Sequence, residues 1–249
     1  MDPEGYRDRL FKRYVTTHTA YAHDHRWRSS VLESHFRSYL FRFLPEDRSA
    51  PILDVGCGSG EMILILQSMG YTDVRGIDLS WEQIEEAISR GAENVEVADA
   101  VEYLSDRREE FSLILALDFI EHLNKEEVLP FLDAAHASLM NGGVLILSTP
   151  NMASPFGARM AFGDFTHEVG FTPVSIAQVL RAAGFDPVGI FPCKPVVHGL
   201  ASGLRWLTWK ILSMFVKLYL MAETGLFEGE VHTQVMYVVG RKSASPKLT

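Results

Sequence analysis

The sequence has few cysteines and lacks an excess of positive charge. Cys57 and Cys193 are its only cysteines, too few for a disulfide framework. Acidic residues outnumber basic ones by 32 to 23, and the net charge of −9 argues against a nucleic-acid substrate. The first residues also lack the basic segment and apolar core of a signal peptide. We therefore expect a cytoplasmic protein with no nucleic-acid partner.

The 249 residues, 47% of them hydrophobic, suit one large globular domain. Short β-rich segments alternate with helical ones, which is typical of parallel βαβ units and predicts a doubly wound α/β fold. The predicted strands are 51–55, 73–77, 94–98, 111–117, 143–149, 186–191 and 231–240, and the predicted helices are 60–69, 81–90, 125–140 and 173–183.

The segment from Ile52 to Gly60 is the most informative part of the chain. An apolar run ends at Asp54 and is followed by Gly56, Gly58 and Gly60, directly before a helical stretch. Glycine permits a positive φ and lets a ligand approach the backbone, and the helix start behind it offers free N–H groups. This strand–turn–helix pattern predicts a site for a nucleoside-type cofactor.

The spacing of the glycines argues against a dinucleotide. In a dehydrogenase the third glycine would occupy position 61, where this chain has Glu61, and a carboxylate is a poor neighbour for a pyrophosphate. The segment instead resembles motif I of the class I S-adenosylmethionine-dependent methyltransferases. This resemblance implies a seven-stranded, mostly parallel sheet with N-terminal helices, a helical insertion and an antiparallel last strand. A dehydrogenase and a catalytically silent cofactor-binding module remain the alternatives from other classes.

Two further acids follow predicted strands at the positions that this resemblance requires. Asp78 ends the second strand, where an acid can accept both ribose hydroxyls, and Asp99 ends the third, where the matching acid in the family binds the adenine amino group. Capping of the next helix is the structural alternative for both. The residues expected to hold the cofactor are Asp54, Gly56, Cys57, Gly58, Gly60, Asp78, Leu79, Asp99, Ala100 and Asp118.

A third group of polar residues follows the fourth strand. Asp118, Glu121 and His122 form an Asp-x-x-Glu-His pattern that resembles ubiquinone-pathway O-methyltransferases. Small-RNA 2′-O-methyltransferases carry a similar pattern, with a later His, as ligands of a divalent cation that binds adjacent hydroxyls. The corresponding ligand set here is Asp118, Glu121, His122 and His167. In metal-free relatives the Glu lies near the cofactor and the His is structural.

The loop after the fifth strand is long enough to suggest a function. It contains Asp164 and His167, and a histidine with a pKa near 7 suits the removal of a hydroxyl proton during methyl transfer. We predict His167 as the catalytic base, Asp164 as its orienting partner or as an acceptor of a substrate hydroxyl, and His122 as the second choice. The alternative is that His167 only shapes the loop.

Short strings in the C-terminal half resemble methyltransferases of bacterial polysaccharide and glycolipid pathways. They are Asp-Phe-Thr-His at 164–167, Phe-Thr-Pro at 171–173, Glu-Thr-Gly at 223–225 and His-Thr-Gln at 232–234. This resemblance implies a saccharide or glycolipid hydroxyl as acceptor. A phenol or quinone-type molecule is the alternative O-methylation substrate, and N-methylation of an amino sugar is also open.

Three segments lie outside the predicted sheet. They are a helical lid at 1–45 that precedes the methyltransferase domain at 46–249, the loop at 150–172, and an insertion at 192–230. Within the insertion, 204–221 predicts a widely apolar helix, and its cations make a membrane span unfavourable. We expect it to pack as a lid or in a homodimer, or to lie on the inner membrane face as a peripheral contact.

Overall fold

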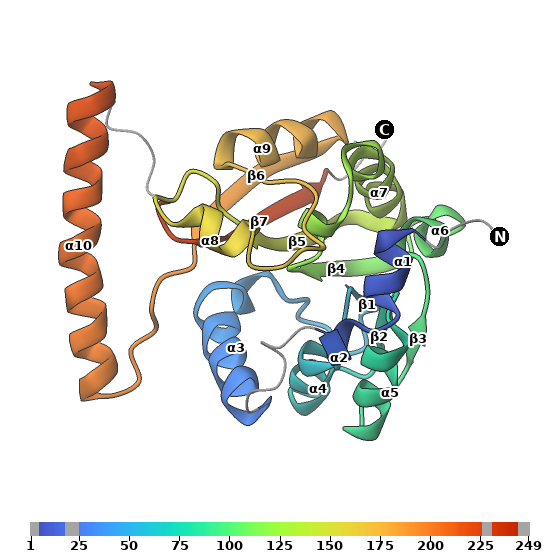
Figure 1. The fold of residues 1–249 in the computed structure, drawn as a ribbon. Helices are drawn as coiled ribbons and strands as arrows, with labels where there is room; N and C mark the ends of the chain where they lie inside the picture. The colour runs from blue at the N-terminus through green and yellow to red at the C-terminus, as the bar shows by residue number, and fades with distance from the viewer. Residues whose placement is uncertain (1–4, 18–24, 226–230, 244–249) are drawn as a thin grey trace.

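The structure, a computed structural model, describes residues 5–17, 25–225 and 231–243. Its centre is a seven-stranded sheet with the order β3-β2-β1-β4-β5-β7-β6 (Figure 1). The doubly wound α/β fold predicted from the sequence is confirmed. The strands are β1 Ile52–Val55, β2 Val74–Asp78, β3 Val95–Val97, β4 Phe111–Leu117, β5 Leu139–Pro150, β6 Phe185–Pro192 and β7 Val235–Lys242.

The pairing of the strands determines where a ligand can bind. β1 pairs in parallel with β2 and β4, β2 pairs with β3 and β4 pairs with β5. Only β7 runs antiparallel, between β5 and β6. The carboxyl ends of β1 to β5 therefore meet at one edge of the sheet, and the strand order reverses between β1 and β4. Ligands of open parallel sheets bind beyond this edge.

Helices cover both faces of the sheet. One face is covered by α3, α4 and α5, and the opposite face by α6, α7 and α9 (Figure 1). The helices are α1 Tyr6–Phe11, α2 Tyr14–Thr17, α3 His25–Tyr39, α4 Glu61–Ser68, α5 Trp81–Ser89, α6 Ala100–Ser105, α7 Lys125–Ser138, α8 Gly157–Ala161, α9 Pro173–Ala182 and α10 Leu200–Thr224, with 3-10 turns η2 Phe41–Phe43 and η3 Ile120–His122. Among the described residues, no helix is long and apolar enough to cross a membrane.

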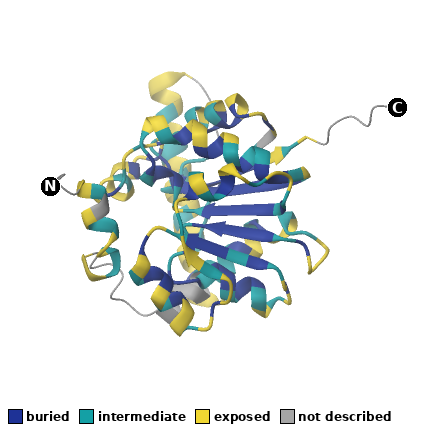
Figure 2. Ribbon diagram, turned by 90° about the vertical axis from the view of Figure 1, so that its right-hand side faces the viewer, coloured by how far each residue is buried: buried dark blue, intermediate teal, exposed yellow. Residues whose placement is uncertain are grey.

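The central strand β4 shows why the sheet needs a layer on each side. Ile114 and Ala116 pack in the core under α6, α7 and α9, whereas Leu113 and Leu115 pack in the core with α3, α4 and α5. Alternate side chains of a strand point to opposite faces, so a continuous apolar run requires burial on both. The strands are accordingly the most deeply buried part of the molecule (Figure 2).

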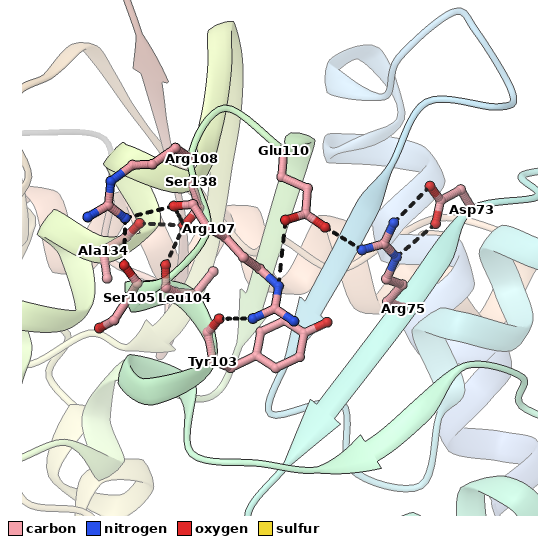
Figure 3. Close-up of polar contacts among 10 residues, drawn as sticks. All are labelled: Asp73, Arg75, Tyr103, Leu104, Ser105, Arg107, Arg108, Glu110, Ala134 and Ser138. Atoms are coloured by element: carbon pink, nitrogen blue, oxygen red, sulfur yellow. Dashed lines mark hydrogen bonds and ion pairs between the residues drawn. The ribbon is translucent and has the colours of Figure 1, made fainter.

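A polar network closes the other edge of the sheet, away from the carboxyl ends of the strands. The Glu110 carboxylate accepts a hydrogen bond from Arg75 at 2.6 Å and lies 3.6 Å from Arg107, while Arg75 also pairs with Asp73 at 3.0 Å (Figure 3). Nearby, the buried Ser138 hydroxyl bonds to backbone carbonyls of α6 and α7. These bonds join β2, β4, α6 and α7 without adding groups to the ligand edge.

The N-terminal segment differs from the expected lid. Phe36 and Leu40, in and directly after α3, are 0% and 1% exposed and pack in the core with α4. In the described part of 1–45, α3 therefore belongs to the main body, and the lid stays a prediction for α1 and α2. The sequence pattern also missed α6 and α8, which have only six and five residues and carry little helical periodicity.

The buried position of Phe36 predicts a large loss of stability on truncation. We expect Phe36→Ala to lower the free energy of unfolding by about 3 kcal/mol or more, because it leaves a cavity in a close-packed core. The matched control is Phe41→Ala, since Phe41 is 45% exposed and lies only five residues later. Urea denaturation measures both variants. Equal losses would show that α3 is not part of the core.

Candidate active site

A cavity of about 1050 Å³ opens at the carboxyl edge of the sheet. Its wall includes the ends of β1 to β4, the turn η3, the loop after β5 and residues from α1 and α2. Thirteen predicted site residues line it: Asp54, Gly56, Cys57, Gly58, Asp78, Leu79, Asp99, Ala100, Asp118, Glu121, His122, Asp164 and His167. The structure therefore gathers almost all of the predicted residues at one place.

The turn after β1 has the backbone conformation that its glycines predict. Gly56 and Gly58 have φ values of 69° and 53°, in the left-handed region that favours glycine. A Cβ on Gly56 would lie 2.8 Å from the ring of Phe119, so this position also needs the space. The N–H groups of Gly56 and Cys57 both donate to the carbonyl of Ile77, which fixes the turn on β2.

Gly60 is the predicted binding residue that does not line the cavity. It caps α4 with a φ of 77°, and a Cβ there would lie 2.9 Å from Ala92 and 3.1 Å from Ala87. Its contact with the cofactor therefore stays a prediction, while the structure shows a packing role for it. Gly60 is needed for the close packing of the turn against α5, whereas Gly56 and Gly58 form the cavity wall.

Asp54 is a buried acid on this wall. It is 3% exposed, and none of the ion pairs among the described residues involves it. Burial, together with the nearby carboxylates of Asp78 and Glu61, raises the pKa of Asp54 to about 8. A cationic ligand would remove this unfavourable energy, because it would supply the missing opposite charge.

Asp78 is held in place by the turn itself. Its carboxylate accepts hydrogen bonds from the N–H groups of Gly58, at 3.0 Å, and Ser80, at 2.7 Å. Burial nevertheless raises the pKa of Asp78. The neighbouring Glu61 differs because it pairs with Arg90 at 2.7 Å, and this hydrogen bond lowers the pKa of Glu61 although burial opposes the shift.

Asp99 and Asp118 have structural bonds in addition to their places on the wall. The Asp99 side chain accepts from the N–H groups of Val101 and Glu102, so it is the N-cap of α6. Asp118 has a φ of 51°, unusual for a residue with a side chain, and accepts a hydrogen bond from Ser148 at 2.7 Å. Asp99 therefore caps α6, as the structural alternative predicts, and it also lines the cavity.

Glu121, His122 and His167 form a compact cluster of metal-ligand type. Their ligand atoms all lie within 4.8 Å of one another. Glu121 is 2% exposed, its Oε2 has no hydrogen-bond partner among the described residues, and burial raises its pKa well above the usual value. The structure does not place Asp118 in this cluster, because its carboxylate is bonded to Ser148 instead. The predicted four-residue ligand set is therefore reduced to three.

Hydrogen bonds at Nδ1 fix both imidazole rings of the cluster. The Thr166 hydroxyl donates to Asp164 at 2.7 Å, so its oxygen must accept from Nδ1–H of His122, 2.9 Å away. Nδ1–H of His167 donates to the carbonyl of Ala161 at 2.9 Å. Each neutral ring consequently keeps a free lone pair on Nε2. A fixed Nδ1 partner of this kind is typical of histidines that bind metals or accept protons.

The partner of Asp164 corrects one prediction. Asp164 does not orient His167, since its oxygens accept from Tyr14 and Thr166, and through Thr166 it orients His122. These two hydrogen bonds lower the pKa of Asp164, although burial opposes the shift. The acid is therefore ionised at neutral pH and stabilises the observed arrangement of Thr166.

The electrostatic environment makes His122 a weak base. Burial, together with the neighbouring His167, lowers the pKa of His122 to about 4. An imidazole with this pKa accepts few protons at pH 7, but it stays neutral and so remains available to a cation. Its role as a second general base is disfavoured for this reason.

Helices α1 and α2 cover the cluster from the side. Arg7 donates to the Glu127 carboxylate at 2.6 Å and to the carbonyl of His122 at 3.0 Å. Tyr14 donates to Asp164 at 2.6 Å, and Thr16 bonds to Glu82 of α5. Arg7 and Tyr14 line the cavity, and no local pattern in the sequence pointed to Arg7.

A second polar cluster on the wall was not predicted. His35 Nδ1 lies 3.0 Å from the Cys193 thiol, which is 3.6 Å from the Tyr237 hydroxyl, and all three residues line the cavity. Burial raises the pKa of Cys193 to about 11, so the thiol is neutral. The cluster offers neutral hydrogen-bonding groups to the cavity, and it joins α3, the residue after β6, and β7, which are far apart in the sequence.

Comparisons with known proteins agree on one family. A family model described as a methyltransferase domain matches residues 23–189. Over 171 residues the chain is 30% identical to a ubiquinone biosynthesis O-methyltransferase of Azorhizobium caulinodans. This alignment covers 63% of this chain and 66% of the relative. A protein of the same name from a Chelativorans species is 31% identical over 148 residues, or 53% of this chain and 57% of the relative. The chain thus spans less than two thirds of these relatives.

Solved structures share the fold at low sequence identity. A methyltransferase from Archaeoglobus fulgidus, described as dependent on S-adenosylmethionine, superposes with a TM-score of 0.67 at 19% identity, covering 92% of this chain and 99% of that one. At this level of identity the likeness shows the fold alone.

The unpaired state of Asp54 predicts a pH-dependent cost in stability. Its raised pKa means that folding takes up a proton, so raising the pH from about 4 to about 8 destabilises the native state by up to about 1.4 kcal/mol per pH unit. Asp54→Asn removes this effect. We expect the variant to unfold at a higher temperature than the wild type, by a margin that grows with pH over this range.

Thermal denaturation of ligand-free protein at several pH values measures the margin. Glu96→Gln is the control, since it neutralises an exposed acid on the neighbouring edge strand β3. A margin that stays constant with pH would contradict the assignment of a raised pKa to Asp54.

Proposed function

Because the chain belongs to the methyltransferase-domain family, the class I enzymes that use S-adenosylmethionine, we propose that it methylates a hydroxyl of a small acceptor with two adjacent hydroxyl groups. The observation that carries the proposal is the Glu121–His122–His167 cluster on the wall of the cavity, in which Glu121 is buried and the two histidines are partly buried. The cofactor supplies a methyl group on a sulfonium, and an alcohol attacks it well only as its proton leaves.

The first turn fits this cofactor. Asp54 is a buried acid without a cation, and an ammonium group of the cofactor would supply one. Asp78 keeps carboxylate lone pairs for the ribose hydroxyls beside its two backbone bonds, and Asp99 lies further along the wall. Gly56 and Gly58 keep the turn open, because a side chain at either position would have to adopt a positive φ.

The three-residue cluster fits a divalent cation. Glu121 offers a carboxylate oxygen without another partner, and the two histidines offer Nε2 lone pairs because their Nδ1 atoms are bonded elsewhere. Two imidazoles and a carboxylate suit a first-row divalent metal. A bound cation would lower the pKa of a coordinated hydroxyl. The three residues would hold the cation, serve as its neutral or anionic ligands, and exclude bulk water.

His167 has a second role to be tested at the same atom. If no cation were involved, the lone pair on Nε2 of His167 would take the proton from the substrate hydroxyl, which is the role that the sequence predicts. The pKa of His122, lowered to about 4, favours the cation over the base for that residue. Both roles require Ala161 to hold the His167 ring in its observed tautomer.

A phenolic ring is the acceptor that best fits the wall. Phe11, Tyr14, Phe119 and Tyr237 line the cavity, and aromatic rings stack well on a flat acceptor. The curated relatives named above carry the name of ubiquinone biosynthesis O-methyltransferases, which is consistent with such a ring. The saccharide or glycolipid hydroxyl remains a prediction from short sequence strings, and an amine remains open.

Removal of the cation tests the role of the cluster. We expect a chelator to lower methyl transfer by about 100-fold, with recovery on adding a divalent metal, because the acceptor hydroxyl then loses its main acidifying group. Glu121→Gln should show the same loss without recovery, while Glu85→Gln, at an exposed acid of α5, should not. Full activity after chelation, together with a large loss in His167→Ala, would favour the general base instead.

The choice of acceptor is tested by competition between two diols. We expect transfer to a catechol with an alkyl substituent to exceed transfer to a methyl glycoside by at least about tenfold, and to fall by a similar factor when one catechol hydroxyl is removed. Quantification of radiolabelled methyl groups measures all three acceptors. Preferential methylation of the glycoside would favour the saccharide, and labelling that persists in Asp54→Asn would contradict the assigned cofactor site.

A further inference from the structure

Helix α10 is the largest element that the proposed function does not use. It has 25 residues, of which only Ser202 is buried, and it stands at the side of the molecule, apart from the layers of the fold (Figure 1). Long helices of water-soluble domains bury an apolar stripe against a neighbour. This helix keeps its apolar residues exposed, so a different surface must cover them.

The exposed apolar residues form a continuous stripe. At 100° per residue, residues 200, 204, 207, 211, 214, 215, 218 and 221 fall within about one third of the helix circumference. Every one of them is at least 40% exposed. They are Leu200, Leu204, Leu207, Ile211, Met214, Phe215, Leu218 and Met221.

The opposite side of the helix is the less exposed one. Ser202 is buried, while Trp206, Trp209, Ser213 and Leu220 are partly covered. The side with serines thus faces the rest of the protein, and the most apolar side faces outward. This orientation is the reverse of what a helix adopts when its purpose is to fill the core of its own domain.

The charges beside the stripe have one dominant sign. Arg205, Lys210 and Lys217 flank it, and Glu223 near the end is the only acid of the helix. This basic segment belongs to a chain with a net charge of −9. Lys210 lies 4.8 Å from the ring centre of Trp206, a pair that combines a cation with an amphipathic ring at the border of the stripe. An anionic surface would therefore attract this helix more than the rest of the molecule.

We propose that α10 lies flat on the surface of an anionic lipid bilayer, with its apolar stripe at the boundary between headgroups and acyl chains. An exposed apolar stripe flanked by cations is the composition of interfacial helices, which bind through buried apolar area and attraction to anionic lipids. The lysine stems reach the phosphates while the stripe enters the apolar layer. The helix does not cross the bilayer, in agreement with its charge content.

A second copy of the chain fits the same surface less well. The spacing of the stripe, four and three residues in alternation, would also suit a helix pair. However, Leu212 and Tyr219 extend the exposed apolar surface beyond a narrow seam, at 59% and 63% exposure. Lys210 and Lys217 are both at the same heptad position, so the pair would have no acid on the facing helix to meet them.

The position of α10 links the bilayer to the cavity. The chain enters the insertion just after Cys193 and returns at Val235, and both residues line the cavity. A bilayer under α10 would thus lie near the cavity wall formed by β6 and β7. If the proposed function holds, this arrangement suits an acceptor that carries a lipid tail, although lipid binding itself does not depend on that function.

Sedimentation with sucrose-loaded vesicles tests the proposal on the full chain. We expect the protein to sediment with vesicles of phosphatidylcholine and phosphatidylglycerol, and to do so much less with phosphatidylcholine alone or in high salt. Lys210→Glu should weaken the partition coefficient at least about fivefold. Phe215→Ser should weaken it similarly by removing apolar area from the stripe.

Two matched variants control for charge and apolar area. Arg181→Glu reverses one exposed cation of α9, and Val174→Ser removes a side chain of α9 that is 79% exposed. Both should bind vesicles like the wild type, with unchanged circular dichroism in all four variants. Absence of binding to anionic vesicles would overturn the proposal. A second contradicting result would be a dimer in light scattering that Ile211→Asp dissociates, together with no binding of the protein to vesicles.

Discussion

A buried acid without a cation, Asp54 at the carboxyl end of β1, is the constraint on which the site depends. Its position follows from the sheet: β1 lies inside the sheet, between β2 and β4, and ends where the strand order reverses. The turn that follows must curve away from the acid without filling the space above it, which Gly56 and Gly58 allow. An acid at this place destabilises the empty fold and becomes favourable when a cationic ligand binds.

The remainder of the site surrounds the space above Asp54 and comes from segments that are far from β1 in the sequence. The Glu121–His122–His167 cluster joins η3 to the loop after β5, and hydrogen bonds from the Nδ1–H groups of its histidines to Thr166 and Ala161 select their tautomers. Arg7 then fastens the N-terminal helix to the carbonyl of His122. In the proposed function, cofactor binding and acceptor activation would therefore use adjacent parts of one wall, as methyl transfer between two bound molecules requires.

Sequence reasoning succeeded where the signal is local. The family, the fold and the first turn depend on apolar runs, glycine spacing and acids at strand ends, and the family and the fold are confirmed. Local patterns could not separate Gly60, which packs against α5, from Gly56 and Gly58, which form the wall. They also could not show that Asp99 caps a helix, because α6 is too short to have a period.

Sequence reasoning failed where the answer is a contact between distant segments. The wrong partner for His167 came from choosing an acid of the same loop, Asp164, whereas the structure uses the carbonyl of Ala161, which every residue type could supply. The cluster of His35, Cys193 and Tyr237 joins three elements and leaves no pattern in any of them. The apolar stripe of α10 was visible in the sequence, but only the structure shows that it faces outward.

The most direct test of the central claim is a calorimetric titration with S-adenosylhomocysteine at neutral pH, repeated in two buffers of different ionisation enthalpy. The account predicts binding with release of about one proton, because the Asp54 carboxyl, with a pKa of about 8, must ionise beside the ligand ammonium. Asp54→Asn should abolish that release and weaken binding. Absence of heat, or binding with the same proton balance in both proteins, would contradict the account.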